Sequence, residues 1–410
     1  MQTTRPQRSS SSRRSFAAGP SNRPAHGRTA FRGPKKKKNF GESIDVSKFI
    51  KKAVPLKVKD ENDLEVTSCT FADFEFCEQI SKNLARKKYI HPTPIQEKSM
   101  HDIIKGRDLI GLANTGTGKT GAFLLPLINK TDLDRTQKTL IIAPTRELAQ
   151  QIDDEYRQFA FGMRLFSAIC VGGMPVMRQI NDVRRHPNFV IGTPGRLKDL
   201  GDRGEIKYSE FTNVVVDEVD QMMDMGFIND IKYILSQMPR ERQSLFFSAT
   251  MPPKIKELAL KFLKQPVTVA VKTGTTTDNV EQDIIRVKDP SKKFEELHKL
   301  LKQVHLEKVL IFSETKRDVE RLTNDLIRAG FKADSIHGDK RQRERQRALN
   351  LFREGQTKIL VATDVAARGL DIKNITHVIN YTIPQTYDDY THRIGRTGRG
   401  ENMGVALTFV

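Results

Sequence analysis

The sequence is poor in cysteine and contains no tryptophan. Its three cysteines, Cys69, Cys77 and Cys170, form no CxxC pair and do not cluster with histidine. So few cysteines, odd in number, argue against a disulfide framework and for a reducing compartment, and a cytoplasmic protein is expected. The same spacing gives no zinc site. Aromatic residues make up only 7% of the chain, which disfavours a platform that binds nucleic acid by base stacking.

Long hydrophobic runs are missing as well. No apolar run approaches the roughly 20 residues that cross a bilayer, and the N-terminus lacks the apolar region of a secretory signal. With 410 residues, of which 37% are hydrophobic and 29% charged, the chain is typical of two globular domains with a polar extension. No membrane partner is expected. The protein is expected to be a monomer.

Acidic residues are absent from the first 40 positions, which contain eleven Lys and Arg. Of the net charge of +19, the remaining 370 residues therefore carry only +8. Residues 1–42 are rich in Ser, Gly, Pro and Arg, which predicts a disordered basic tail. It is either an arm that binds phosphates non-specifically or a solubilising tail. In the extension that follows (43–70), residues 43–53 have helix-like apolar spacing, and the hypothesis is that they dock on the body.

Apolar, β-rich runs alternate with helical patterns from about residue 70. The runs are continuous, as expected for parallel strands covered on both faces, and the helical segments between them indicate βαβ units. The predicted strands are 108–113, 139–143, 188–193, 213–217 and 244–249, and then 308–313, 358–363, 376–381 and 404–410.

A polar, Gly/Thr-rich stretch at 271–280 separates the two series of strands and is predicted to be a linker. The predicted fold class is therefore α/β, with two tandem domains at 71–270 and 281–410, each a mostly parallel sheet flanked by helices. The second domain ends on its last predicted strand, where such a domain would usually add a covering helix. Whether the chain is truncated at Val410 or naturally short is left open.

The stretch ANTGTGKT (113–120) follows a predicted strand and precedes a helical run. In this context it matches the phosphate-binding loop, although Ala113 replaces the usual first glycine. Two glycines let backbone N–H groups curl round the phosphates, helped by the helix N-terminus. The lysine would reach the β and γ phosphates, and the last threonine would bind Mg²⁺. The predicted nucleotide-binding residues here are Thr115, Gly116, Thr117, Gly118, Lys119 and Thr120.

Three carboxylates, Asp217, Glu218 and Asp220, stand at the exit of the apolar run NVVVD. Ligands bind at the carboxyl edge of parallel sheets. Asp217 is therefore predicted to hold Mg²⁺ through water, and Glu218 to orient and deprotonate the water that attacks the γ-phosphate. The alternative, a solvated acidic turn, is disfavoured by the phosphate-binding loop that precedes it.

Nine motifs then follow one another in a fixed order: PTPIQ (92–96), ANTGTGKT, PTRELA (144–149), GG (172–173), TPGR (193–196), DEVD (217–220), SAT (248–250), ARGLD (367–371) and HRIGRTGR (392–399). Across nearly all of residues 71–410 the sequence resembles the DEAD-box RNA helicases, and MMDMGFINDI (222–231) resembles a bacterial subgroup. The resemblance implies two RecA-like domains, ATP and Mg²⁺ as cofactors, and RNA as partner.

The resemblance also implies how the base and sugar of ATP are held. Gln96 offers a carboxamide that can pair with adenine N6–H and N7 and would reject guanine. Phe71 would stack on the adenine, with a core aromatic as the alternative. Gly369 and Asp371 match the ARGLD motif, in which the aspartate binds the ribose. The family often has a glycine where Lys88 stands.

The segment HRIGRTGR implies arginine fingers. Arg396 and Arg399 match the family's fingers, which stabilise charge that develops on the γ-phosphate. His392 and Arg393 are expected to couple the domains at their interface. Because loop and fingers lie on different domains, the site should be complete only when the domains close.

The remaining motifs imply contacts to RNA and a relay. Small residues and helix N-termini suit backbone contacts to phosphate, and 2′-hydroxyl contacts would favour RNA over DNA, with little sequence specificity. For the two arginines of the first domain, an ordinary surface position is the alternative. The predicted RNA-binding residues are Pro144, Thr145, Arg146, Gly172, Gly173, Thr193, Pro194, Gly195, Arg196, Gly338 and Thr363. The residues predicted to relay between the ATP site and RNA are Asp220, Ser248 and Thr250.

The predicted function is an RNA-stimulated ATPase that unwinds short RNA duplexes locally and non-processively, or remodels RNA–protein complexes. Ribosome precursors and structured messages are targets that the resemblance allows. An ATP-gated RNA clamp or annealing scaffold is the alternative, and a DNA translocase is less favoured.

Overall fold

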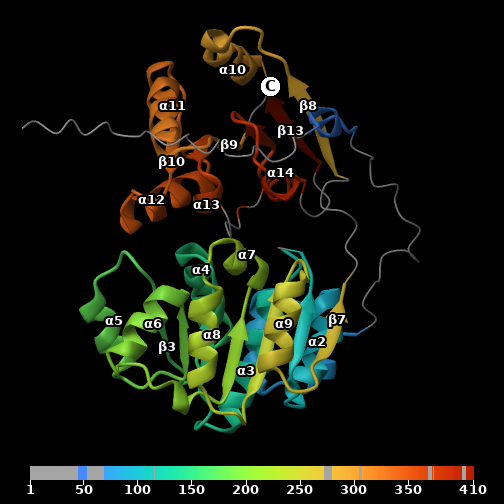
Figure 1. Cartoon of the computed structure of the whole chain (residues 1–410). Helices are drawn as coiled ribbons and strands as arrows, with labels where there is room; N and C mark the ends of the chain where they lie inside the picture. Colours follow the sequence, from blue (N-terminus) through green and yellow to red (C-terminus); the bar gives the residue numbers. More distant parts are fainter. Residues whose placement is uncertain are drawn as a thin grey trace, which may run out of the picture. The chain divides into compact units, whose positions relative to one another are not determined.

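The computed structural model describes residues 45–52, 69–114, 116–271, 279–303, 307–367, 372, 374–398 and 403–410. The predicted tail (1–42) lies outside these residues. We call 69–271 the first half and 279–410 the second half. Their relative placement is not determined (Figure 1), so each is described by itself. No helix within the described ranges combines the length and apolar character that crossing a membrane requires.

The first half contains a seven-stranded, entirely parallel sheet of order β3-β4-β2-β5-β6-β1-β7. Strands β2, β4, β5 and β6 are buried along their whole length. The strands are β1 (Leu109–Leu112), β2 (Thr139–Ile142), β3 (Ser167–Cys170), β4 (Phe189–Gly192), β5 (Asn213–Val216), β6 (Gln243–Ser248) and β7 (Val267–Ala270).

Helices cover both faces of this sheet, which explains the continuous apolar strands. Along β5, Val215 packs into one hydrophobic cluster while Val214 and Val216 pack into the other. The first cluster contains residues of η2 (Phe71–Phe74), α1 (Glu78–Arg86), α2 (Pro94–Ile104), α3 (Lys119–Leu133) and α4 (Arg146–Phe159). The second contains residues of α5 (Val176–Val183), α6 (Pro194–Asp202), η3 (Tyr208–Glu210), α7 (Val219–Asp224), α8 (Ile228–Gln237) and α9 (Pro253–Phe262).

The second half contains a six-stranded parallel sheet of order β10-β11-β9-β12-β13-β8. Its strands are β8 (Val280–Ile285), β9 (Val309–Phe312), β10 (Ala333–Ile336), β11 (Ile359–Ala362), β12 (His377–Asn380) and β13 (Gly404–Phe409). Its helices are η4 (Pro290–Lys292), α10 (Lys293–Gln303), α11 (Lys316–Arg328), α12 (Gln342–Arg353), α13 (Asp364–Ala367) and α14 (Tyr387–Ile394). Here too, separate hydrophobic clusters pack against α12 and α13 and against α10 and α11.

The predicted fold class, two parallel α/β sheets flanked by helices, is confirmed. All nine predicted strands exist, with ends that differ by a residue or two. The four strands that the sequence patterns missed, β3, β7, β8 and β10, are the edge strands of the two sheets. They are only partly buried, so they lack the continuous apolar run of a central strand. The domain limits of 71–270 and 281–410 stay a prediction, and most of the predicted linker lies outside the described residues.

The hypothesis that residues 43–53 dock on the body is confirmed for the described part, 45–52. Residues Val46–Phe49 form a single 3₁₀ turn, η1, and Lys51 pairs antiparallel with Gln282 of β8. Figure 1 shows this short blue turn beside β8.

Lys88 adopts a backbone conformation that favours glycine. After α1 ends, Lys88 has φ +57°, and its N–H donates to Ala85 O at 2.9 Å. The same position after α2 is occupied by Gly106, with φ +76°. A side chain with positive φ costs about 1–2 kcal/mol relative to the ordinary region, so the departure from the family's glycine is a local strain.

We expect Lys88→Gly to raise the stability of the first half by about 1 kcal/mol, because it removes that strain from an exposed side chain. The midpoint of denaturant unfolding, followed by a probe in the first half, measures the change. The reciprocal Gly106→Lys should lower stability by a similar amount, and Lys105→Gly, at φ −70°, should not raise it. A decrease in stability for Lys88→Gly would contradict the conclusion that the backbone at Lys88 is strained.

Candidate active site

The loop between β1 and α3 requires its glycines. Gly116 and Gly118 have φ of +86° and +92°, and Gly118 is the residue that precedes helix α3. A Cβ on Gly118 would lie 2.7 Å from Gln96 Nε2 and 2.8 Å from Thr93 Oγ1. The loop therefore turns tightly against the start of α2, and the unpaired N–H groups of the first turn of α3 offer an anion site.

Lys119 is the first residue of α3 and is buried, with 5% of its surface exposed. Its Nζ lies 3.9 Å from Glu218 Oε1 and has no hydrogen-bond acceptor among the described residues. A buried ammonium without hydrogen bonds is unfavourable unless a ligand supplies them. Phosphate oxygens next to the glycine loop would do so, and the site therefore fits a nucleotide.

Asp217 and Glu218 follow the C-terminal end of β5, on the same side of the sheet as the loop after β1. Both are buried, and Glu218 has φ +52°, an uncommon conformation that points to a functional constraint. Asp217 Oδ1 accepts the Glu218 N–H at 3.0 Å. Burial raises the pKa of Asp217 to about 7; Lys119 opposes this rise, and the neighbouring Glu218 adds to it.

The donor set fits Mg²⁺ held mainly by a nucleotide. Thr120 and Asp217 offer a hydroxyl and a carboxylate, the oxygen ligands that Mg²⁺ prefers. Within the described ranges, no three His, Cys, Asp or Glu side chains gather into a protein metal cage. Mg²⁺ commonly binds through one or two protein oxygens plus substrate phosphates, so this arrangement suits the predicted cofactor.

The side chain of Gln96 forms hydrogen bonds within the protein. Its Nε2 donates to Gly118 O and its Oε1 accepts the Thr93 N–H, both at 2.9 Å. The side chain is buried and links the start of α2 to the phosphate-binding loop. A carboxamide has a second N–H and a second lone pair, so the predicted adenine contact stays a prediction. The sequence motif pointed to the residue but not to this supporting bond.

Phe71 lies in the hydrophobic core of the first half with 6% of its surface exposed. Its ring centroid is 6.4 Å from that of Phe74 and 6.5 Å from that of Tyr89. These contacts favour the alternative of a core aromatic, and stacking on adenine stays a prediction.

The predicted relay residues are brought together. Asp220 Oδ2 accepts hydrogen bonds from the N–H groups of Ala249 and Thr250, at 3.0 and 2.9 Å, and from Thr250 Oγ1 at 3.1 Å. The Asp220 N–H donates to Ser248 Oγ at 3.3 Å. The carboxylate two residues after Glu218 is thus tied to the chain that follows β6, and any shift of one should displace the other. The relay function itself stays a prediction.

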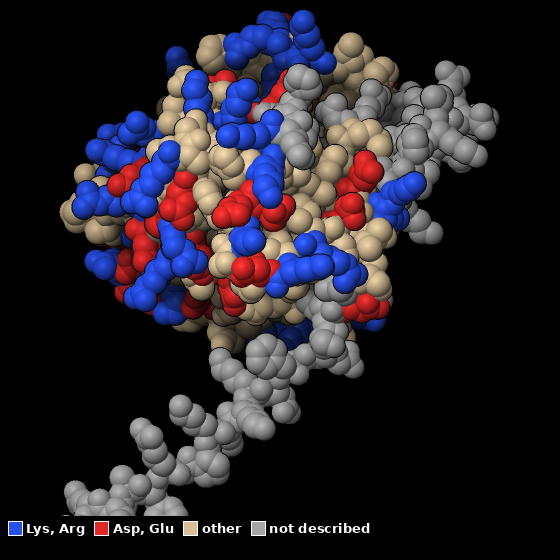
Figure 2. Space-filling view, turned by 90° about the horizontal axis from the view of Figure 1, so that it is seen from above, with Lys and Arg blue, Asp and Glu red and all other residues tan. Residues whose placement is uncertain are grey.

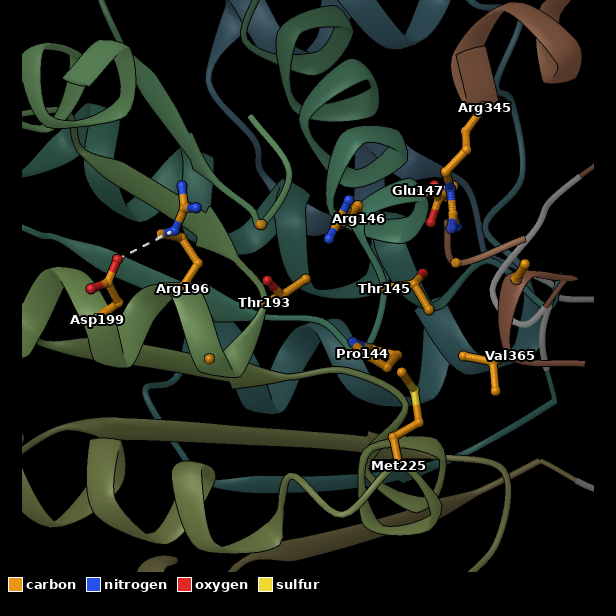
Figure 3. A pocket seen from close by; sticks show the side chains of 14 residues that line it. Pro144, Thr145, Arg146, Glu147, Thr193, Arg196, Asp199, Met225, Arg345 and Val365 are labelled. Atoms are coloured by element: carbon orange, nitrogen blue, oxygen red, sulfur yellow. Dashed lines mark hydrogen bonds and ion pairs between the residues drawn. The ribbon is translucent and has the colours of Figure 1, made fainter. Parts of the chain in front are cut away.

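The position of Arg146 explains why the predicted GG motif requires glycines. Its guanidinium lies against Gly172 and Gly173, where a Cβ on Gly173 would be 2.1 Å from Arg146 Nη1. Thr145 caps α4 by accepting the Leu148 N–H at 3.2 Å. Figure 3 shows Arg146 between Thr145 and Thr193 among the residues that line one pocket.

Arg196 is held by neighbouring residues of the first half. Its Nη1 donates to Met174 O at 3.4 Å and its Nε lies 3.6 Å from Asp199, the ion pair drawn in Figure 3. Pro194 and Gly195, at the start of α6, lie beside it, with Pro194 buried and Gly195 exposed. The RNA-binding role of these residues stays a prediction.

One supporting residue, Gln179, was missed. Its buried carboxamide accepts the Val171 N–H and donates to Val171 O, both at 3.0 Å, and so fixes the backbone just before Gly172. The available signal was a glutamine one position before the buried Ile180 of an amphipathic helix.

In the second half, Arg393 is 3% exposed, and its guanidinium donates several hydrogen bonds. It donates to both carboxylate oxygens of Asp364, at 2.5 and 2.7 Å, and to Asn380 Oδ1 and Thr382 O. These contacts anchor α14 within the second half, and the predicted role of Arg393 in coupling the domains stays a prediction. Arg396 follows α14 and is 6% exposed.

The other predicted residues of the second half are placed as follows. His392 and Thr363 are half-buried, and Gly338 is exposed with open space around its Cα. Thr363 O accepts the N–H groups of Ala366 and Ala367, which starts α13. Four predicted residues lie outside the described ones: Thr115, Gly369, Asp371 and Arg399.

Comparison with known proteins identifies the family to which this chain belongs. The sequence matches the DEAD/DEAH box helicase family over residues 93–258 and the helicase conserved C-terminal domain over residues 292–401. A curated relative, the ATP-dependent RNA helicase CshA of Limosilactobacillus reuteri, is 42% identical over 342 residues, which span 83% of this chain and 69% of that protein. The chain belongs to the DEAD/DEAH box helicase family.

Further relatives of the helicase agree. The DEAD-box ATP-dependent RNA helicase CshA of Geobacillus kaustophilus is 43% identical over 83% of this chain and 73% of its own length. Among solved structures, S. cerevisiae Dbp5 bound to RNA and ADP BeF3 has a TM-score of 0.74 at 30% identity, covering 83% of this chain and 89% of that chain. Mss116p bound to ssRNA and AMP-PNP has a TM-score of 0.75 at 28% identity, covering 83% and 73%. The predicted family, RecA-like fold and ATP-dependent RNA helicase function are confirmed.

We expect Gln96→Glu to weaken ATP binding about tenfold, because a carboxylate cannot donate to Gly118 O and leaves that carbonyl facing negative charge. Equilibrium titration with ATP and with GTP measures the change. Since the contact to Gly118 serves any triphosphate, both affinities should fall by a similar factor, whereas Gln237→Glu, on an exposed helix end of the same half, should change neither. A loss confined to ATP would show that adenine pairing, and not loop support, is what Gln96 contributes.

Proposed function

We propose that the helicase binds ATP and Mg²⁺ at the loop 115–120 and Asp217, and hydrolyses ATP only when RNA and nucleotide draw the two halves together. The observation that carries the proposal is the buried Lys119 ammonium, which lacks a hydrogen-bond acceptor among the described residues. A nucleotide phosphate is the ligand that its surroundings fit best.

Each side chain of the site then has one task. Lys119 binds the β and γ phosphates as a point charge. Glu218 orients the attacking water and accepts its proton, which its position beside Asp217 and Lys119 supports. When bound, Mg²⁺ neutralises phosphate charge and activates the γ-phosphate. Arg396 and Arg399 are proposed to stabilise the charge of the transition state from the second half, a contribution worth roughly 10³–10⁵ in rate for arginine fingers.

RNA is proposed to lie across the motif surface that contains Arg146, Gly172 and Thr193, with Gly338 and Thr363 contributing from the second half. The helicase's solved relatives Dbp5 and Mss116p were bound to RNA and ssRNA. Figure 2 shows acidic side chains among the basic ones on the face seen from above, so the described residues of that face do not form a continuous basic surface. Contacts concentrated at the motifs, on sugar and phosphate, would give binding with little sequence specificity.

Closure on one bent RNA strand would expel its complement. Stacking averages about 1.4 kcal/mol per base-pair step in DNA duplexes, so removing a few pairs is within reach of nucleotide-coupled closure. The bonds from Asp220 to Thr250 support a path by which the ATP site senses RNA. We propose that a cytoplasmic monomer acts in this way on ribosome precursors or other RNA–protein complexes, with the basic tail as a phosphate-binding arm.

An ATP-gated RNA clamp or annealing scaffold would use the same site. A strand-displacement assay on a short blunt RNA duplex, with and without ATP, separates the two, since a clamp would bind without releasing strands. A DNA translocase would show equal stimulation of ATP hydrolysis by DNA and RNA.

We expect Glu218→Gln to bind ATP and RNA with unchanged affinity but to hydrolyse ATP at least about 100-fold more slowly, because the amide cannot accept the proton of the attacking water. Single-turnover hydrolysis with saturating RNA measures the rate. Glu257→Gln, an exposed glutamate on α9, is the control and should keep the original rate. Turnover by Glu218→Gln at that original rate would remove Glu218 from the mechanism.

A further inference from the structure

The segment 45–52 precedes the first half in sequence but packs on the second half. The Lys51 N–H donates to Gln282 O at 2.9 Å, and the Gln282 N–H donates to Lys51 O at 2.7 Å. Asp45 caps the turn by accepting the Ser47 N–H at 3.1 Å. The segment therefore adds a short antiparallel pairing to β8, the edge strand of the second sheet (Figure 1).

Phe49 anchors this segment. Its side chain is fully buried, and its ring is stacked on Tyr390 with centroids 4.1 Å apart and planes 25° apart. The two rings form a small hydrophobic cluster with Val280, Ile394 and Ala406. A fully buried aromatic ring on so short a segment marks a specific docking contact rather than a solvated connection.

Gln282 joins the docked segment to the same helix. While its backbone pairs with Lys51, its Oε1 accepts the Tyr390 hydroxyl at 3.0 Å. Tyr390 is thus held from two sides, by the ring of Phe49 and by the side chain of Gln282. Both contacts fix the middle of α14 against the edge of the sheet.

Helix α14 leads directly to Arg396. Ile394, one turn after Tyr390, is its last residue, and the Arg396 N–H donates to Arg393 O at 3.1 Å. The Thr397 N–H donates to Ile394 O at 3.0 Å. The backbone of Arg396 is therefore bonded to the last turn of α14. The orientation of this helix determines the position from which the Arg396 side chain extends.

The helix is held at two places. The fork of Arg393 on Asp364 fixes its inner side, and the ring of Phe49 packs on Tyr390, which also donates to Gln282. The first contact belongs to the second half itself, whereas the second is supplied by residues that precede the first half in the chain. Loss of Phe49 would leave α14 in place but free to shift by the small distances to which catalytic groups respond.

We propose that Phe49 is a positioning residue for Arg396: the docked segment 45–52 holds α14 so that Arg396 meets the γ-phosphate. This inference rests on the proposed role of Arg396 as an arginine finger. In this role Phe49 acts through Tyr390 and not by direct contact with nucleotide or RNA.

Steady-state ATP hydrolysis by the full chain at saturating RNA tests the proposal. Phe49→Ala should lower kcat by about 10- to 100-fold, while the affinity for a non-hydrolysable ATP analogue changes less than about twofold, because the finger acts on the transition state. Phe49→Leu, which stays apolar but cannot stack, should fall in between. Ile50→Ala is the matched control, since Ile50 is 54% exposed, and should keep the original kcat.

The same variants in an Arg396→Ala background separate positioning from general damage. If Phe49 acts through Arg396, Phe49→Ala should have no further effect there. An unchanged kcat for Phe49→Ala, or an equal fall with and without Arg396, would overturn the inference. If the unfolding midpoint shows that Phe49→Ala does not fold, Phe49→Leu replaces it. Its kcat is then compared in the same way, with and without Arg396→Ala. If Arg396→Ala itself hydrolyses ATP at the original rate, the finger role fails, and the inference fails with it.

Discussion

A buried ammonium facing two buried carboxylates is the interaction on which the active site depends. Lys119 approaches Glu218 at 3.9 Å without a hydrogen bond, and Asp217 beside them has its pKa raised to about 7 by burial. Such an arrangement is poor for stability, since desolvated charges are only partly compensated. It would suit ligand binding, because a bound phosphate would supply the oxygen acceptors that the Lys119 ammonium lacks. The φ of +52° at Glu218 adds local backbone strain at the same place.

The parallel sheet of the first half explains why the motifs meet. Every strand runs in the same direction, so the segments that follow the strands emerge at one edge. The phosphate-binding loop follows β1, Thr145 and Arg146 follow β2, and the carboxylates follow β5. Because both faces of the sheet are covered by helices, this edge remains the place for polar chemistry. In the second half, α14 similarly brings Arg393 into the interior and Arg396 to its end.

The sequence predicted the central strands and the glycine loop before α3, because their signals are local. An apolar run of four to six residues marks a strand with neighbours on both sides, and a glycine loop before a helix marks an anion site. The edge strands β3, β7, β8 and β10 escaped because partial exposure interrupts their apolar pattern. Contacts between distant segments escaped for another reason. Neither the bond from Gln96 to Gly118 nor the stacking of Phe49 on Tyr390 has any signature in the residues nearby.

The most direct test is a crystal structure of the helicase with Mg²⁺ and a non-hydrolysable ATP analogue. The account predicts that Lys119 Nζ leaves Glu218 and lies about 3 Å from an oxygen of the β or γ phosphate, with Asp217 facing the metal. An analogue bound elsewhere, or phosphates in this loop with Lys119 still turned to Glu218, would contradict it.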